Sequence, residues 1–294
     1  MKKKSTQDFY SKWFIAPAAI LFIIFFVVPN LASFVLGFTD WSLYDFNNIK
    51  FNGLENFRRL FSEKTFAIAI KNTFYFAIVT VLIKNVFGFL MALIVKKTSK
   101  FNTLLRAVVF LPMTISVMVV AIIFVSIYNP SNGIINEGLR AIGLDSLTRD
   151  WLFDARYSMN SICLMDIWQG TGFTMCVMIS GLQAIPTDYY EAAKIDGADK
   201  WQQLRYVTLP LLISSITISL VFNIISGFKV FAQVYSTTNG GPADSTHVLG
   251  TFLFKSFGNG FLGYSAAVGL FTTVLIVALS MTLLAILRKR EVEY

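Results

Sequence analysis

Long, nearly uncharged apolar stretches are the feature of this sequence that most constrains its fold. Each has the length of about 20 residues that a helix needs to cross a hydrocarbon core about 30 Å thick. Backbone amides cannot stay unpaired in hydrocarbon, and continuous apolar runs indicate helices rather than the alternating strands of a barrel. We therefore expect an all-α integral membrane bundle of six transmembrane helices, near residues 13–36, 68–95, 104–127, 159–182, 210–231 and 262–287.

Composition supports a chain whose main solvent is the lipid bilayer. Of 294 residues, 55% are hydrophobic and 14% charged, whereas soluble domains carry about a quarter charged residues. The net charge of +8 does not indicate nucleic acid, because the Lys and Arg residues lie in short loops between helices and not on one polar face. Cys163 and Cys176 fall in one expected helix, so no disulfide framework is implied.

The distribution of positive charge predicts the topology. No small-residue cleavage site follows the N-terminal segment MKKKSTQDFYSKWF, so we expect an uncleaved first span. Six spans put both termini on one side of the membrane. With the termini in the cytoplasm, fourteen of the 25 Lys and Arg residues lie in cytoplasmic segments, eight in the outer loops and three in or at spans. Positive residues near span ends are retained inside, so both termini are predicted to be cytoplasmic. We expect a single transmembrane domain over residues 1–294.

A polar cytoplasmic stretch at 184–212 separates the fourth and fifth spans. It is expected to form two short helices, the first capped by Asp188 with Glu191 at capping-box spacing. Gly197 suits the left-handed conformation that ends a helix, and Pro210 suits the first turn of the next span. Ala192 and Ala193 leave a narrow face that can lie in a groove of another protein.

This stretch, EAAKIDGADKWQQLRYVTLPLL, resembles the EAA loop of permease subunits in binding-protein-dependent ABC importers. The outer segment FKVFAQVYSTTNGGPADST and the segment GLENFRRLF resemble the maltose and glycerol-phosphate type of sugar permease, so the resemblance covers nearly the whole chain. The residues at the family's spacing are Glu191, Ala192, Ala193, Gly197, Leu209 and Pro210.

The resemblance implies a type I importer permease of the MetI-like fold in the bacterial inner membrane. The coupling loop, 184–209, would then sit in a cleft of a cytosolic ATPase dimer. A second, homologous permease subunit would form a heterodimer with this chain, and an extracytoplasmic solute-binding protein would deliver a sugar or oligosaccharide. ATP and Mg would bind the partner ATPase, because the chain has no G-x-x-x-x-G-K-[ST] loop. From physics alone, Glu191 could equally be an ordinary helix-capping carboxylate and the two alanines simple helix formers.

Two ionisable residues stand out within the expected spans: Lys84 lies near the middle of the second, and Asp166, in the fourth, is the only carboxylate in any of them. Such groups cost about 2.5 to 3.5 kcal/mol on insertion scales and normally face a cavity, a partner or a pathway. They could form a buried ion pair that holds helices together, Lys84 could snorkel to an interface, or both could line the solute pathway.

The sequence DIWQGTGF suits a sugar, because aromatic faces cover the apolar side of a pyranose and amide or carboxylate groups bond hydroxyls. It nominates Asp166, Trp168, Gln169, Gly170 and Phe173. In similar permeases this stretch and the end of the fifth span line the pathway, which adds Asn223, Gly227 and Phe228. An acid at the position of Asp166 is not a fixed feature of those permeases, so it could be structural, and Trp168 could be a packing aromatic.

Other classes of function find little support. The single histidine, His247, has no ligand-spaced Cys, Glu or second His, so we expect neither a metal site nor catalytic residues. An ATP-independent carrier or channel would more often show paired inverted halves, which are not evident. A permease for glycerol phosphate or another polar solute is the alternative within the family, and the sequence does not identify the sugar.

Overall fold

The computed structural model describes residues 12–289, and within this range the regular structure is helical apart from one isolated bridge between Thr39 and Phe51. The chain divides into two compact units. One comprises residues up to Ser62 together with Leu253–Phe271, and the other comprises Glu63–Phe252 together with the residues from Thr272 onward. The terminal residues 1–11 and 290–294, including the lysines at the N-terminus, lie outside the described residues. The expected single domain stays a prediction.

Four of the expected spans are continuous helical segments. They are Trp13–Leu36, which contains α1 (Ala16–Phe22), a π-helical turn (Ile23–Val27) and α2 (Val28–Leu36), then α4 (Lys64–Val95), α8 (Ser158–Ala184) and α15 (Leu262–Arg288). Each is long and apolar enough to cross a membrane. The structure thus agrees with the expected ranges to within a few residues at most ends.

The other two expected spans are bent, which the sequence analysis did not anticipate. The third consists of α5 (Lys100–Phe110), a 3₁₀ turn (Leu111–Thr114) and α6 (Val117–Ile127), with a bend of 99°. Pro112 lies in that turn and Ile115 is extended, so the helical ladder is interrupted there. Counting each bent pair as one span gives six.

The fifth expected span is bent by 64° between Lys200–Leu211 and α12 (Ile213–Phe228). Its first part contains α10 (Lys200–Gln203), a π-helical turn (Leu204–Thr208) and α11 (Leu209–Leu211). Pro210 therefore lies in α11, before the bend, and not in the first turn of α12 as expected. A π turn and a proline are recognised causes of helix bending.

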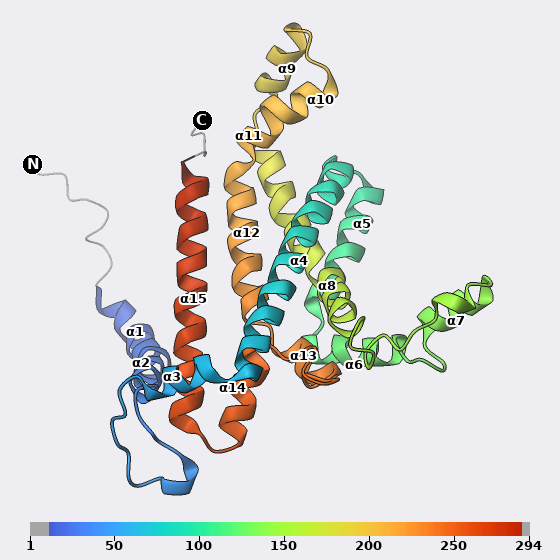
Figure 1. Cartoon of the computed structure of the whole chain (residues 1–294). Coiled ribbons are helices and arrows are strands. Elements are labelled where there is room, and N and C mark those ends of the chain that lie inside the picture. Colours follow the sequence, from blue (N-terminus) through green and yellow to red (C-terminus); the bar gives the residue numbers. More distant parts are fainter. Residues whose placement is uncertain (1–11, 290–294) are drawn as a thin grey trace, which may run out of the picture. The chain divides into compact units, whose positions relative to one another are not determined.

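The larger unit is built around α4, α8 and α12, which lie side by side (Figure 1). Apolar residues of α4 and α8 form a buried cluster that includes Ala92, Met175 and Met178. Small residues also let α5 approach α8 closely: a Cβ on Gly172 of α8 would collide with the backbone of Val109 and Phe110 in α5. Close packing replaces the hydrophobic driving force, which is absent between helices in lipid.

The smaller unit contains α3 (Glu55–Ser62), parts of α14 (Leu249–Gly258) and α15, and the first span. Asn56 is buried and donates hydrogen bonds to the carbonyls of Gly37 and Thr39 at 2.9 and 2.8 Å. The guanidinium of Arg59 lies 4.5 Å from the ring centre of Tyr264. These contacts fix the loop after the first span.

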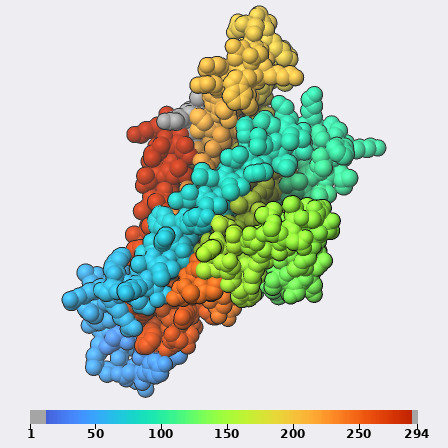
Figure 2. All heavy atoms as spheres, turned by 45° about the vertical axis from the view of Figure 1, so that its right-hand side comes forward, coloured from blue at the N-terminus to red at the C-terminus, as the bar shows by residue number. Residues whose placement is uncertain are grey.

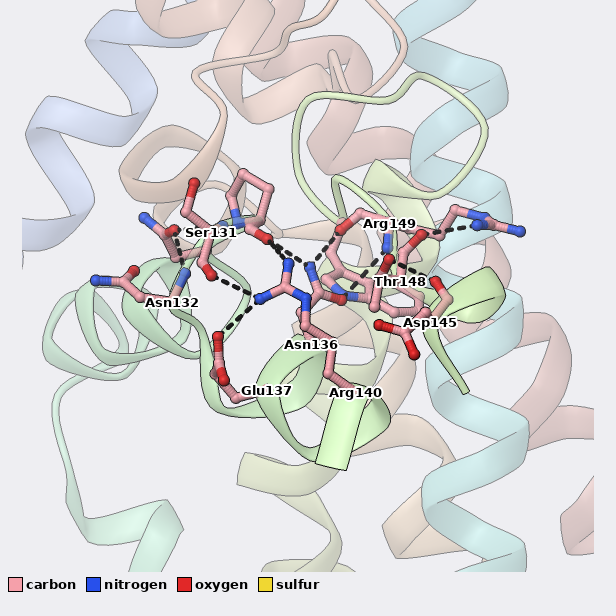
Figure 3. A network of polar contacts seen from close by, with 11 residues as sticks. Ser131, Asn132, Asn136, Glu137, Arg140, Asp145, Thr148 and Arg149 are labelled. Carbon is pink, nitrogen blue, oxygen red and sulfur yellow. Dashed lines mark hydrogen bonds and ion pairs between the residues drawn. The ribbon is translucent and has the colours of Figure 1, made fainter. Parts of the chain in front are cut away.

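The segment after α6 contains α7 (Ile134–Ala141) and is ordered by a polar network (Figure 3). Buried Asn136 donates to the carbonyls of Pro130 and Arg149, at 3.1 and 2.8 Å, and accepts from the indole of Trp151 at 2.8 Å. Arg140 bonds the carbonyl of Ser131. The satisfied amide and guanidinium explain why this long polar connection forms ordered turns.

Candidate functional site

A cavity of about 410 Å³ in the larger unit is the first candidate site. Its walls come from α4, α8, α12, α13 (Ala232–Thr237) and the bend at 113–117. The cavity brings together six of the nine residues predicted for the solute pathway, namely Lys84, Asp166, Gln169, Gly170, Phe173 and Asn223.

Helical spacing explains why α8 supplies most of the wall. Asp166, Gln169, Gly170 and Phe173 follow one another at intervals that place them on one face of a helix. Apolar residues elsewhere on α8, among them Met175 and Met178, pack against α4 and α5.

The charged centre of the cavity is an ion pair between Lys84 and Asp166. The Lys84 Nζ atom lies 2.6 Å from Asp166 Oδ2, and both side chains are buried. The other carboxylate oxygen, Oδ1, accepts a hydrogen bond of 3.0 Å from the Gln233 amide. A Cβ on Gly170 would lie 2.9 Å from Lys84 Cδ, so the glycine leaves room for the lysine chain. Lys84 and Asp166 therefore both pair and line the cavity.

Two amides tie the walls of the cavity to one another. Gln169 donates a 2.9 Å hydrogen bond to the carbonyl of Ile115, a backbone group at the bend after α5. Asn223 donates to the hydroxyl of Thr174 at 3.0 Å and joins α12 to α8. These bonds supply partners to polar groups that hydrocarbon would leave unpaired.

An aromatic pair provides the apolar part of the wall. The rings of Phe173 and Phe222 have centroids 4.2 Å apart with planes inclined by 34°, and both line the cavity. The site thus combines one paired charge, several amides and hydroxyls, and a flat apolar surface, a set that can hold a polar solute with an apolar face.

Three residues predicted for the pathway do not line this cavity. Trp168 lies on a different face of α8 from Asp166 and Gln169. Its side chain is partly exposed and packs against Phe124, with ring centroids 5.3 Å apart. Gly227 faces the backbone of Ala77. Phe228 is buried against Phe74 in an edge-to-face contact. All three make packing contacts between or on helices.

Sequence reasoning missed Gln233, Phe222, Ser226 and the bend at 113–117, which also line the cavity. Pro112 followed by Thr114 and Ser116 was the available signal for a break in the third span. No comparable signal marked Gln233, because its contact with Asp166 joins segments far apart in the chain.

The second candidate site is the loop that connects α8 to α12, which stands clear of the other helices of its unit (Figure 2). It contains α9 (Thr187–Ile195) and α10. Gly197 has a φ of +78°, the left-handed conformation that was predicted, and no atom lies within 4 Å of a Cβ built on it. Glu191 and Ala192 are exposed, whereas Ala193, Leu209 and Pro210 are half-buried.

The predicted capping box at the start of this loop is wrong. Pro186 occupies the N-cap position of α9 and Asp188 makes no capping bond. The chain leaves α8 through Ile185 and Pro186, and α9 begins at Thr187, two residues too early for Asp188 to be its N-cap. A capping box does form at the second helix, between Asp199 and Gln202.

No group of three or more His, Cys, Asp or Glu residues that could hold a metal ion occurs within residues 12–289. His247 is buried and its Nδ1 atom lies 2.8 Å from the hydroxyl of Thr251. The histidine thus contributes to packing and hydrogen bonding in the segment before α14.

Comparison with known proteins relates both sites to membrane transport. A probable ABC transporter permease, YurN of Bacillus subtilis, is 36% identical over 274 residues, covering 92% of each chain. The lactose transport permease LacF of Rhizobium radiobacter is 32% identical and covers 82% of this chain and 81% of its own. The trehalose/maltose permease MalF of Thermococcus litoralis is 29% identical and covers 94% and 93%.

A solved structure shares the fold. A chain of a bacterial ABC transporter that imports the acidic polysaccharide alginate superposes with a TM-score of 0.81, covering 94% of both chains at 24% identity. Residues 84–292 match the family described as the inner membrane component of binding-protein-dependent transport systems. That match includes the bent spans, the cavity walls and the loop between α8 and α12, and the chain belongs to this family of transporter permeases.

Proposed function

We propose that this chain is one membrane-spanning subunit of an ATP-driven importer that carries a saccharide into the cytoplasm. One observation carries the proposal: the exposed loop with α9 and α10 connects α8 to α12, and both of these helices contribute residues to the cavity wall. A displacement of the loop would therefore move two walls of the solute cavity.

The cavity chemistry supports a saccharide as the solute. The Phe173 and Phe222 rings offer an apolar surface, while the hydroxyl and amide groups of Ser116, Ser226 and Asn223 offer partners for sugar hydroxyls. The relatives named for lactose and for trehalose and maltose point the same way.

The exposed loop supports a cytosolic ATPase as the partner. Ile195 and Trp201 expose 86% and 66% of their surface on this loop, and exposed apolar groups at the end of a helix pair suit a cleft on another protein. Hydrolysis would take place on that separate subunit, with ATP and Mg bound there. This arrangement requires the loop, and hence both termini, to be cytoplasmic.

Two further partners complete the proposed importer. A second, homologous permease would form a heterodimer with this chain and complete the wall of the cavity. A solute-binding protein would deliver the saccharide at the outer face, as the family's description as binding-protein-dependent indicates.

The test is uptake by the assembled system in proteoliposomes. The chain would be co-expressed with its partner permease, ATPase and binding protein, and labelled neutral oligosaccharides, glycerol phosphate and an acidic oligosaccharide would be supplied outside. ATP-dependent accumulation of an oligosaccharide supports the proposal. Accumulation of glycerol phosphate alone, or uptake that persists without ATP, would contradict it.

A further inference from the structure

A hydrogen bond joins the two sides of the loop between α8 and α12 at its base. The hydroxyl oxygens of Tyr190 and Thr208 lie 3.1 Å apart. Thr208 is buried, and its hydroxyl also lies 3.3 Å from the carbonyl of Gln203. A hydroxyl has one hydrogen to donate, so Thr208 donates to Gln203 and Tyr190 donates to Thr208.

The two residues stand where the loop meets the membrane helices. Tyr190 lies in α9, which follows α8 after Ile185 and Pro186. Thr208 ends the π-helical turn Leu204–Thr208, a few residues before the 64° bend that leads into α12. The bond therefore connects the continuation of α8 to the segment that enters α12.

The segment between α10 and α12 needs such a connection. A π turn and a bend lack the regular ladder of an α-helix, so they deform more easily under a load. Without a cross-link, a displacement applied to α9 and α10 would be absorbed at this joint before it reached the wall residues Phe222 and Asn223 of α12.

Other side-chain bonds in the loop act closer to its tip. Gln203 donates to the carbonyl of Ala198 at 2.9 Å, and the capping box of Asp199 and Gln202 fixes the start of α10. Among the described residues of the loop, the bond between Tyr190 and Thr208 is the side-chain hydrogen bond that links α9 to the π turn.

We propose that Tyr190 and Thr208 are positioning residues for energy coupling, whose hydrogen bond makes α8 and α12 respond together when the loop is displaced. The inference rests on the proposed function, because it assigns a role within the same loop. Neither residue touches the solute cavity, so their contribution is to the transmission of movement and not to solute binding.

The experiment measures solute imported per ATP hydrolysed by the reconstituted complex. Tyr190→Phe and Thr208→Val each remove one hydroxyl and keep the shape of the side chain. We expect each to retain ATPase binding and ATP hydrolysis but to lower the import ratio by about three- to tenfold, the range that one hydrogen bond covers. The double variant should be no worse than either single one, because both remove the same bond.

Two variants serve as controls. Thr208→Ser keeps the hydroxyl that Thr208→Val removes, and it should keep the import ratio of the unmodified complex. Thr103→Val removes a hydroxyl in α5, outside the loop, that bonds the Ser99 carbonyl at 2.9 Å, and it should leave the ratio unchanged.

Three results would overturn the inference: an unchanged ratio in Tyr190→Phe and Thr208→Val, an equal fall in Thr103→Val, or loss of complex assembly instead of coupling. Failure of the proposed function would look different, because the unmodified complex would then show no ATP-dependent uptake of an oligosaccharide at all.

Discussion

Lys84 and Asp166 form an ion pair of 2.6 Å at the wall of a cavity, although they come from different helices. Removing two charges from water costs several kcal/mol per ion, and a hydrophobic pair of similar volume is often as stable. The hydrogen bond from Gln233 to Asp166 offsets part of that cost. Each charge therefore depends on its partner, and this dependence can be tested.

Asp166→Asn should lower the amount of folded complex because it leaves the buried ammonium of Lys84 without its counter-ion. Breaking a buried pair costs about 3–5 kcal/mol. The double variant Asp166→Asn with Lys84→Gln should recover much of the loss. The yield of monodisperse complex in gel filtration measures both effects.

The exposed ion pair of Glu137 and Arg140 provides a matched control. Glu137→Gln should leave the yield unchanged, since exposed pairs contribute little. If Asp166→Asn assembles normally but imports less solute, the carboxylate acts on the solute and not on assembly. Normal assembly with normal uptake would refute both roles.

Gly170→Ala should disturb the same ion pair by displacing the lysine instead of removing the carboxylate. The added methyl group would lie 2.9 Å from Lys84 Cδ and 3.2 Å from Nζ, so the lysine chain must shift and its contact with Asp166 must change. We expect uptake to fall severalfold with a smaller loss of folded complex than in Asp166→Asn. Gly138→Ala is the control, because nothing lies within 4 Å of that position. Equal uptake in the two alanine variants would show that Lys84 adjusts without consequence.

Gly197→Val should uncouple transport while leaving membrane insertion intact. The space around Gly197 is open, so the obstacle is its φ of +78°, which costs a residue with a Cβ about 1–2 kcal/mol. Asn tolerates this conformation better, and Gly197→Asn should keep more activity. Pull-down of the ATPase together with uptake provides the measurement, and normal uptake by the valine variant would refute the role assigned to this turn.

The proposed topology places Lys200 in the cytoplasm and Lys255 outside. Single cysteines at these positions, in a chain whose Cys163 and Cys176 are replaced by alanine, should react differently with an impermeant maleimide on intact cells. Labelling at 255 and protection at 200 is the expected pattern. The reverse pattern would invert the chain and remove the loop from the ATPase.

Hydropathy predicted the helices that are continuous, because the length of an apolar run is a local property of the sequence. It failed at the bends near Ile115 and Leu212, where apolar content continues although the helical ladder does not. The capping pattern is also a local property, and it did not predict which helix is capped. Asp188 and Asp199 both have a suitable partner three residues later in the sequence. Asp199 caps its helix and Asp188 does not, because α9 already begins before Asp188 as the chain leaves α8.

The cavity was predicted in part. The cost of a charge in lipid singled out Lys84 and Asp166, and helical spacing placed Gln169 and Phe173 on the same face as the acid. Gln233 was missed because its role depends on tertiary contact. Trp168 has the chemistry expected of a sugar site but lies on the wrong face of α8.

The hydrogen bond from Gln169 to the Ile115 carbonyl has a consequence for how such transporters diversify. Part of the cavity wall is formed where the helix between α5 and α6 is interrupted. At that point a backbone carbonyl is free to accept a hydrogen bond, and every residue type has the same backbone carbonyl. Amino-acid substitutions can therefore change the side chains of the wall but not this backbone carbonyl. New solute preferences would therefore arise at Phe173, Phe222 and Ser226, whereas Gln169 would be retained as long as the interruption itself is retained.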